Sequence, residues 1–386
     1  MTDKVRMGMK TLFKYASCLA FVGFCSQAVA HSTEERITEL EQQMLEVGAM
    51  TPEGTYGASF TTASSVGQTG WYISVEPLYW HAKVGGTEYA YTDKDFNEVN
   101  DLFITPIKGR VKDQSFSWEW GVRAGLGRHF DHDNWDVNLN YTWYESNDSD
   151  NVSQRLPSAI VGLKSAEPFP YKSLKSHFDL SYNNVNFELG RNYFMSSKVS
   201  VNPHIGVKST WIDERQKVYG DLADLPTVPA HIGVKTREKS IAWGLGPRAG
   251  IQVEGSLGDG FSLYGKLSGA LLYSYFQSSY KQSVSNVPDN AGYGQMHFKG
   301  KNHLFMPTAQ MGLGVNWETS INDKRQHVTL AAGYEVEYFW RANQMLEADD
   351  TIPFFSLTSN TRRMSIERTS EDVMFYGLTL KARLDF

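Results

Sequence analysis

Apolar and polar residues alternate with a period of two over long stretches of this chain. The clearest stretch begins at Trp118, where the apolar positions are Trp118, Trp120, Val122, Ala124, Leu126 and Phe130. The same alternation returns over residues 135–143, 199–211, 241–253, 307–317, 328–340 and 376–386. A period of two predicts strands with one apolar face rather than helices. Many of these segments reach the roughly nine to eleven residues that a tilted membrane-spanning strand needs, whereas soluble strands average about five or six.

Three further segments alternate less regularly, and they bring the number of predicted strands to ten. They are expected over residues 71–82, 178–193 and 261–276. In residues 178–193 the apolar positions shift from even to odd numbers, which predicts a β-bulge at Asn183-Asn184. In residues 261–276 the alternation of apolar and polar residues is interrupted at Gly265, Gly269 and Leu272. The resulting fold class is all-β, a ten-stranded antiparallel transmembrane β-barrel preceded by a short amino-terminal α-helix. A twelve-stranded barrel is the alternative, and a soluble sandwich is a further one.

The connections between these strands alternate in length. Short links are expected at residues 131–134, 194–197, 255–260 and 319–325, and long, polar, irregular ones at 83–115, 145–174, 212–239, 277–303 and 341–371. Outer-membrane barrels alternate short periplasmic turns with long external loops. We therefore expect a cell outer membrane location, both termini in the periplasm, and five external loops. Any of these loops could fold inward and narrow a pore.

The residues before the barrel divide into three segments. Residues 1–30 have basic residues, then an apolar stretch, then Ala28-Val29-Ala30, the pattern of a cleavable signal peptide. Residues 31–50 predict a short periplasmic coiled-coil helix, and residues 51–69 a linker. The helix presents a three-four seam that either joins the subunits of a homo-oligomer or packs locally, formed by Ile37, Leu40, Met44 and Val47.

Charge and cysteine content exclude several classes of function. Signal cleavage removes four of the 37 basic and one of the 43 acidic residues, and the remaining acidic excess makes nucleic acid an improbable partner. Both cysteines, Cys18 and Cys25, lie in the removed segment. No disulfide, thiolate metal site or cysteine nucleophile is therefore expected. We also expect no other metal site and no cofactor.

Three aromatic motifs carry a family resemblance. Residues 71–80 (WYISVEPLYW), 334–346 (YEVEYFWRANQML) and 376–386 (YGLTLKARLDF) resemble the Legionella-type and chlamydia-related major outer membrane protein family. This resemblance spans most of the mature chain and implies an abundant, porin-like surface protein, often oligomeric and sometimes involved in host-cell attachment. The disulfide cross-linking common in that group is not implied, because the mature chain lacks cysteine.

If the apolar series faces lipid, the alternate residues line the lumen. The charged candidates are Glu76, Glu119, Arg123, Glu188, Lys208, Arg248, Glu254, Glu318, Glu335, Glu337, Lys381 and Arg383. Opposite charges favour pairing and closure, whereas inward glycines such as Gly127, Gly314 and Gly333 remove side-chain volume. Barrels of about eight strands have an interior filled by side chains, whereas barrels of 16 to 18 strands leave an open channel. A ten-stranded barrel is close to the smaller size, so side chains should fill much of its interior.

Three functions follow from this interior, in order of preference. The first is a porin-like protein for passive diffusion of small solutes through a narrow or gated lumen, and the second is a plugged barrel acting as surface adhesin or envelope structural protein. An enzyme is not expected: proteases of the omptin type carry Asp and His pairs on the external rim, but Asp131-His132-Asp133 lies in a periplasmic turn, and His177 and Asp179 lack a second acidic pair. Expected partners are outer-membrane lipid, host surfaces, and the barrel assembly machinery, which reads the insertion signal of Tyr376 and Phe386.

Overall fold

The computed structural model describes the part of the chain that contains the expected strands. The described residues are 70–93, 109–130, 135–154, 159–165, 170–196, 198–222, 233–285, 295–321, 326–350 and 364–386. The predicted signal peptide, coiled-coil helix and linker, with Ile37, Leu40, Met44 and Val47, lie outside these residues. No helix among the described residues is long and apolar enough to cross a membrane.

Ten long antiparallel strands form a closed barrel in the described part of the chain. Around the barrel they are β1 (Gly70–Val84), β4 (Trp118–His129), β5 (Trp135–Ser153), β7 (Pro170–Arg191), β9 (Val199–Leu222), β10 (Gly233–Gly258), β11 (Phe261–Ser285), β12 (Met296–Ile321), β13 (Gln326–Asn343) and β16 (Glu371–Asp385). Pairing of β7 with β9 and of β1 with β16 completes the circuit. The ten-stranded prediction is confirmed, and the twelve-stranded alternative is wrong.

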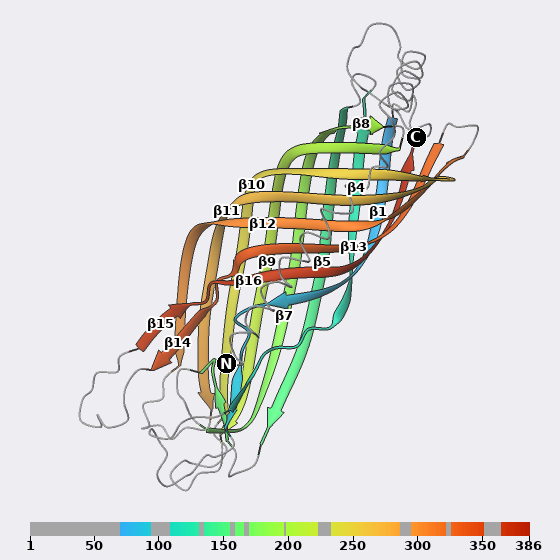
Figure 1. Cartoon of the computed structure of the whole chain (residues 1–386). Helices are drawn as coiled ribbons and strands as arrows, with labels where there is room; N and C mark the ends of the chain where they lie inside the picture. Colours follow the sequence, from blue (N-terminus) through green and yellow to red (C-terminus); the bar gives the residue numbers. More distant parts are fainter. Residues whose placement is uncertain are drawn as a thin grey trace, which may run out of the picture. The chain divides into compact units, whose positions relative to one another are not determined.

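Six short strands lie outside this circuit. They are β2 (Ala90–Asp93), β3 (Gly109–Lys112), β6 (Ala159–Gly162), β8 (Tyr193–Ser196), β14 (Leu346–Asp350) and β15 (Met364–Arg368). All except β8 belong to long links, and β14 and β15 form a hairpin between β13 and β16. Figure 1 shows β8 and the carboxyl terminus at one end of the barrel, which we call the terminal end, and β14 and β15 at the other, which we call the loop end.

The predicted alternation of faces is confirmed by side-chain exposure. Outward-facing residues include Leu139 and Leu313, which are 45% and 68% exposed, while their neighbours in sequence turn inward. Aromatic side chains bound this apolar belt toward the loop end, where Trp211 of β9 pairs with Trp243 of β10. Rings at the edges of an apolar belt suit the two interfaces of a bilayer.

Several strands run much further than the sequence indicated. β9 ends at Leu222 and β10 begins at Gly233, so most of the predicted loop at 212–239 is strand, and residues 145–153, 277–285 and 296–303 are strand as well. At about 3.3 Å per residue, the 26 residues of β10 span on the order of 80 Å, well beyond a hydrocarbon layer of about 30 Å. Beyond Trp211 most of the outward residues are charged, among them Asp213, Arg215 and Lys217, which suits a wall that faces water rather than lipid.

The predicted bulge at Asn183-Asn184 is wrong. Both residues pair in continuous register with β5 and β9. The phase changes because Phe178, Leu180 and Tyr182 point into the barrel and are buried there. Leu272, which weakened the contrast of β11, is buried inside for the same reason. The irregular sequence pattern therefore marks an apolar region of the lumen.

Candidate functional site in the barrel interior

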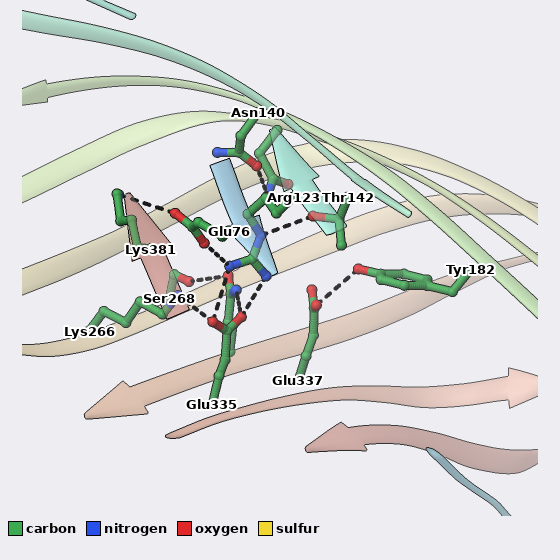
Figure 2. Close-up of polar contacts among 12 residues, drawn as sticks. Glu76, Arg123, Asn140, Thr142, Tyr182, Lys266, Ser268, Glu335, Glu337 and Lys381 are labelled. Atoms are coloured by element: carbon green, nitrogen blue, oxygen red, sulfur yellow. Dashed lines mark hydrogen bonds and ion pairs between the residues drawn. The ribbon is translucent and has the colours of Figure 1, made fainter. Parts of the chain in front are cut away.

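A network of charged side chains crosses the middle of the lumen. Arg123 of β4 lies at its centre and donates hydrogen bonds from Nη1 to Glu76 at 2.8 Å, from Nη2 to Glu335 at 2.8 Å, and from Nε to Thr142 at 3.0 Å. Figure 2 shows the Arg123 guanidinium between the two carboxylates. Two lysines complete the ion pairs at the edge, Lys266 to Glu335 at 2.6 Å and Lys381 to Glu76 at 3.2 Å.

Further pairs connect strands on opposite sides of the barrel. Lys208 of β9 forms an ion pair with Glu337 of β13, and the Tyr182 hydroxyl of β7 donates to the same carboxylate at 2.9 Å. Three strands separate β9 from β13 on the shorter path around the barrel. Lys208 is fully buried and Glu337 is 1% exposed. Side chains therefore bridge the lumen, and together with the Arg123 pairs they form what we call the charge network.

A third set joins the network to the adjoining wall. Arg248 of β10 donates from Nε to Glu188 of β7 at 2.6 Å and from Nη2 to Gln310 of β12. Gln310 in turn donates to Glu335. A buried charge that loses its partner costs several kcal/mol. Loss of any one of these side chains would therefore leave another buried charge unpaired.

An apolar plug fills the lumen on the loop side of the charge network. Its side chains are buried and come from nearly every strand of the barrel: Leu78, Trp80, Ala82, Val84, Tyr144, Phe178, Leu180, Tyr182, Ile212, Ala242, Leu272, Phe276, Met306, Phe339, Ala342, Met345, Val373 and Phe375. The rings of Trp80, Tyr144, Tyr182 and Phe339 all contact Phe375, with centroids 4.5 to 6.1 Å apart. At this level the lumen is closed by apolar side chains.

A polar cavity of about 490 Å³ occupies the terminal side of the charge network. Glu76, Arg123 and Lys266 line its inner end, and His327 and Asp385 line it near the terminal end. The inward glycines do not widen it, because a Cβ at Gly127 would lie 2.1 Å from the Tyr72 ring, and one at Gly333 would lie 2.2 Å from the Tyr264 hydroxyl. These glycines make room for tyrosine rings that themselves fill space.

The loop end is covered by segments of three long links. Lys164, between β6 and β7, places Nζ 2.9 Å from the Gly86 carbonyl oxygen and forms ion pairs with Glu238 of β10 at 3.3 Å and with Glu347 of β14. Burial opposes the charge on Lys164, but the two carboxylates outweigh it and raise the pKa of the ammonium group. Lys164 is 3% exposed. These described segments of the links contact one another and the wall of the barrel at the loop end.

The predicted lumen residues fall into three positions. Eight line the cavity: Glu76, Arg123, Glu188, Arg248, Glu254, Glu318, Lys381 and Arg383. Lys208, Glu335 and Glu337 are buried in the charge network. Glu119 also lies on the inward phase of β4, but near the loop end and away from the network.

The proposed insertion signal lies on the closing strand. Tyr376 contacts the Trp118 ring on the outer face, with centroids 5.9 Å apart. Phe386 is exposed, and its backbone exchanges hydrogen bonds of 2.9 and 3.0 Å with Trp71. These two bonds extend the pairing of β1 with β16 to the last residue.

Sequence reasoning missed three parts of this interior. Lys266 and Gln310 belong to the charge network but were not among the predicted residues, the apolar plug was not anticipated, and Lys164 lies in the predicted link at 145–174, where no site residue was expected. The apolar residues on the inward phase of β7 and β11 were the signal for the plug. No group of three or more His, Cys, Asp or Glu side chains suited to a metal ion lies among the described residues.

A closed antiparallel barrel with an apolar, aromatic-edged outer belt and a charged interior defines an outer-membrane β-barrel protein. Residues 65–386 match the family described as Legionella pneumophila major outer membrane protein precursor, and the chain belongs to this family. This confirms the family resemblance of the sequence motifs. No curated relative matches the chain.

Several solved outer-membrane structures are similar to the chain at low identity. The outer membrane protease OmpT from Escherichia coli is 9% identical, with a TM-score of 0.40, covering 86% of this chain and 99% of that one. The Pseudomonas putida toluene transporter TodX is 10% identical, with a TM-score of 0.32, covering 82% and 89%. A Pseudomonas aeruginosa FadL homologue is 8% identical, with a TM-score of 0.24, covering 84% and 91%. At these TM-scores none of the three bears on what this chain does.

Proposed function

We propose that this protein is a gated outer-membrane pore for small polar solutes, and that the structure represents its closed state. The observation that carries the proposal is the polar cavity, which runs from the terminal end to the charge network and stops beneath the apolar plug. A cavity lined by charges of both signs accepts hydrated solutes of either charge. The plug interrupts the path, since an apolar constriction excludes water and ions.

Part of the plug belongs to a link rather than to the barrel wall. Met345 lies in the link after β13, just beyond an irregular turn of the backbone at Arg341 near the end of that strand, where φ is +59°, a value uncommon for residues other than glycine. The Asp372 carboxylate holds this turn by accepting a hydrogen bond from the Arg341 backbone N–H at 2.8 Å. We infer that release of this strained turn withdraws Met345 and the end of β13 from the plug and opens the lumen, while the pairing of β13 with β16 from His327 to Phe339 stays intact.

The orientation in the membrane belongs to the same proposal. Short links lie at the terminal end and long ones at the loop end, which supports a periplasmic terminal end and an external loop end. The cavity then faces the periplasm. The proposed partners remain outer-membrane lipid, the assembly machinery acting through Tyr376 and Phe386, a homo-oligomer, and host surfaces at the loop end.

A plugged barrel that serves as adhesin or envelope structural protein is the second candidate. It is favoured by the origin of the plug, most of which comes from the strands themselves, including Trp80, Phe339 and Phe375. No catalytic step is part of either proposal. His177 and Asp179 form an ion pair of 3.1 Å, and Asp179 also pairs with Lys217. In the described part of the chain these three residues therefore form a group of salt bridges.

Single-channel recording of the refolded protein in planar bilayers tests the proposal. We expect rare, brief openings for the unaltered protein and more frequent ones for Met345→Ala and Phe375→Ala, which thin the plug. Leu378→Ala is the matched control for Phe375→Ala, because Leu378 lies on the outward face of the same strand, β16. This variant is expected to behave like the unaltered protein. Folded variants that show no steps at any voltage would support the plugged scaffold instead.

A further inference from the structure

Four polar side chains form a compact array on the inner wall beyond the plug. Glu214 and Gln216 of β9 lie directly across from Ser240 and Glu238 of β10, respectively. All four face the interior and are at most 2% exposed. Directly opposed residues on antiparallel strands have Cβ atoms about 4.5 to 5.5 Å apart. We call these four residues the acceptor quartet.

Five of the six side-chain oxygens in the acceptor quartet lack a donor among the described residues. Within the described part of the chain, both carboxylate oxygens of Glu214, Oε1 of Glu238, Oε1 of Gln216 and Oγ of Ser240 have no hydrogen-bond partner. Gln216 Nε2 donates to the Thr87 carbonyl at 3.0 Å and to Ser176 Oγ at 3.2 Å, which fixes the amide with its oxygen unpaired. Buried polar groups are nearly always satisfied, so five such oxygens on one small patch call for a shared partner.

The charge balance around the quartet is negative. Lys164 lies 3.3 Å from Glu238 Oε2, but it also pairs with Glu347. No cationic side chain among the described residues forms an ion pair with Glu214. Glu347 is 40% exposed to solvent and also binds Lys164, so in the described chain the two buried carboxylates of the quartet, Glu214 and Glu238, have no cation of their own. An uncompensated buried charge is strongly unfavourable, and a divalent cation would balance the carboxylates of Glu214 and Glu238.

We propose that the acceptor quartet binds a hard divalent cation of the Ca²⁺ type. The carboxylates of Glu214 and Glu238 provide the charge, and Gln216 Oε1 and Ser240 Oγ provide neutral oxygens. Ca²⁺ takes six to eight oxygen ligands in flexible geometry, so the five unpaired oxygens leave room for water. The absence of nitrogen and sulfur donors from the quartet disfavours transition metals. The site would tie β9 to β10 where the wall leaves the bilayer, a role independent of pore activity.

Titration of the refolded, lipopolysaccharide-free protein in detergent tests this site. After treatment with a chelator, we expect added Ca²⁺ to raise the thermal unfolding temperature by several degrees, with saturable heat in calorimetry. Glu214→Gln, which keeps the shape but removes the charge, is expected to weaken Ca²⁺ binding at least tenfold. Asp213→Asn is the matched control, because Asp213 is the adjacent residue and pairs with Arg215 at 2.6 Å.

Two further measurements keep the proposal falsifiable. Ser240→Ala retains both carboxylates and is expected to weaken Ca²⁺ binding severalfold even if Glu214→Gln fails to fold. Mg²⁺ and K⁺, tested alone, are expected to bind more weakly than Ca²⁺. If Ca²⁺ leaves the unfolding temperature unchanged, or shifts it equally in Glu214→Gln and Asp213→Asn, the site is wrong and Glu214 is a neutral, protonated acid.

Discussion

The Tyr182 ring of β7 stacks on the Phe375 ring of β16, with centroids 4.5 Å apart and an interplanar angle of 27°. Three strands separate β7 from β16 along the shorter path around the barrel, so this contact crosses the lumen. A water-filled channel would keep such strands apart. Here the two walls are joined through an aromatic contact, with the charge network directly beneath it.

The first prediction concerns the contribution of this contact to stability. Phe375→Ala removes a fully buried ring that touches four other aromatic side chains. We expect the free energy of unfolding to fall by about 3 to 5 kcal/mol, as for other buried Phe→Ala changes. Urea unfolding from lipid vesicles, followed by tryptophan fluorescence, measures it. A loss below about 1 kcal/mol would show that the plug is loosely packed.

The second prediction concerns Arg123 at the centre of the charge network. Arg123→Met removes the buried cation between Glu76 and Glu335 and leaves the two carboxylates with only the lysines at the edge of the network, so we expect a loss of about 3 to 5 kcal/mol. The double variant with Glu335→Gln should recover part of that loss, because one of the two repelling carboxylate charges is gone. Lys381→Met is the control, since its side chain is 37% exposed and should cost less than about 1 kcal/mol. Equal losses for Arg123 and Lys381 would contradict the network.

Strand number and facing were predictable because lipid demands an unbroken apolar outward series. Leu139 and Leu313 show this clearly, since each stands in a regular alternation and each is exposed on the outer wall. The protruding strands were not predictable in the same way. From Asp213 to Asp221 the outward face is mostly charged, and the contrast between apolar and polar residues that identifies a strand is lost.

The interior was predictable by residue type but not by pairing. The alternation correctly predicted that Arg123 and Glu335 face inward. Their ion pair was not predictable, because 212 residues separate them and no sequence spacing relates them. The apolar plug was harder still, because Tyr182 and Leu272 interrupt the alternation and resemble noise when each strand is read alone. An inward apolar residue finds its partner across the lumen, which only the closed barrel shows.

The third prediction locates the bilayer on the outer wall. Spin labels at Leu139 and Leu313 should be accessible to oxygen and shielded from a water-soluble nickel complex, because both positions lie in the apolar belt. A label at Lys217, six residues beyond Trp211 on β9, should show the reverse. Aqueous exposure at Leu139 and Leu313 would exclude the barrel as a membrane-spanning structure, whereas lipid exposure at Lys217 would move the bilayer toward the loop end.

The last prediction concerns Lys164, which joins Gly86, Glu238 and Glu347 at the loop end. Lys164→Met leaves two carboxylates without their cation, so we expect the free energy of unfolding in chelator to fall by about 3 to 5 kcal/mol. Lys217→Met, whose ion pair with Asp179 is 32% exposed on the lysine side, should cost less than about 1 kcal/mol.

Measurements with and without Ca²⁺ distinguish two reasons why Lys164→Met would lower stability: the carboxylates depend on the Lys164 ammonium group alone, or they also bind a metal ion. Lys164 competes with a bound cation for Glu238, so its removal should raise Ca²⁺ affinity about tenfold, and Ca²⁺ should restore part of the lost stability. Urea unfolding with and without Ca²⁺ measures this difference directly. If the Lys164→Met protein is equally unstable in both conditions, the carboxylates at the loop end depend on the ammonium group alone and share no metal ion.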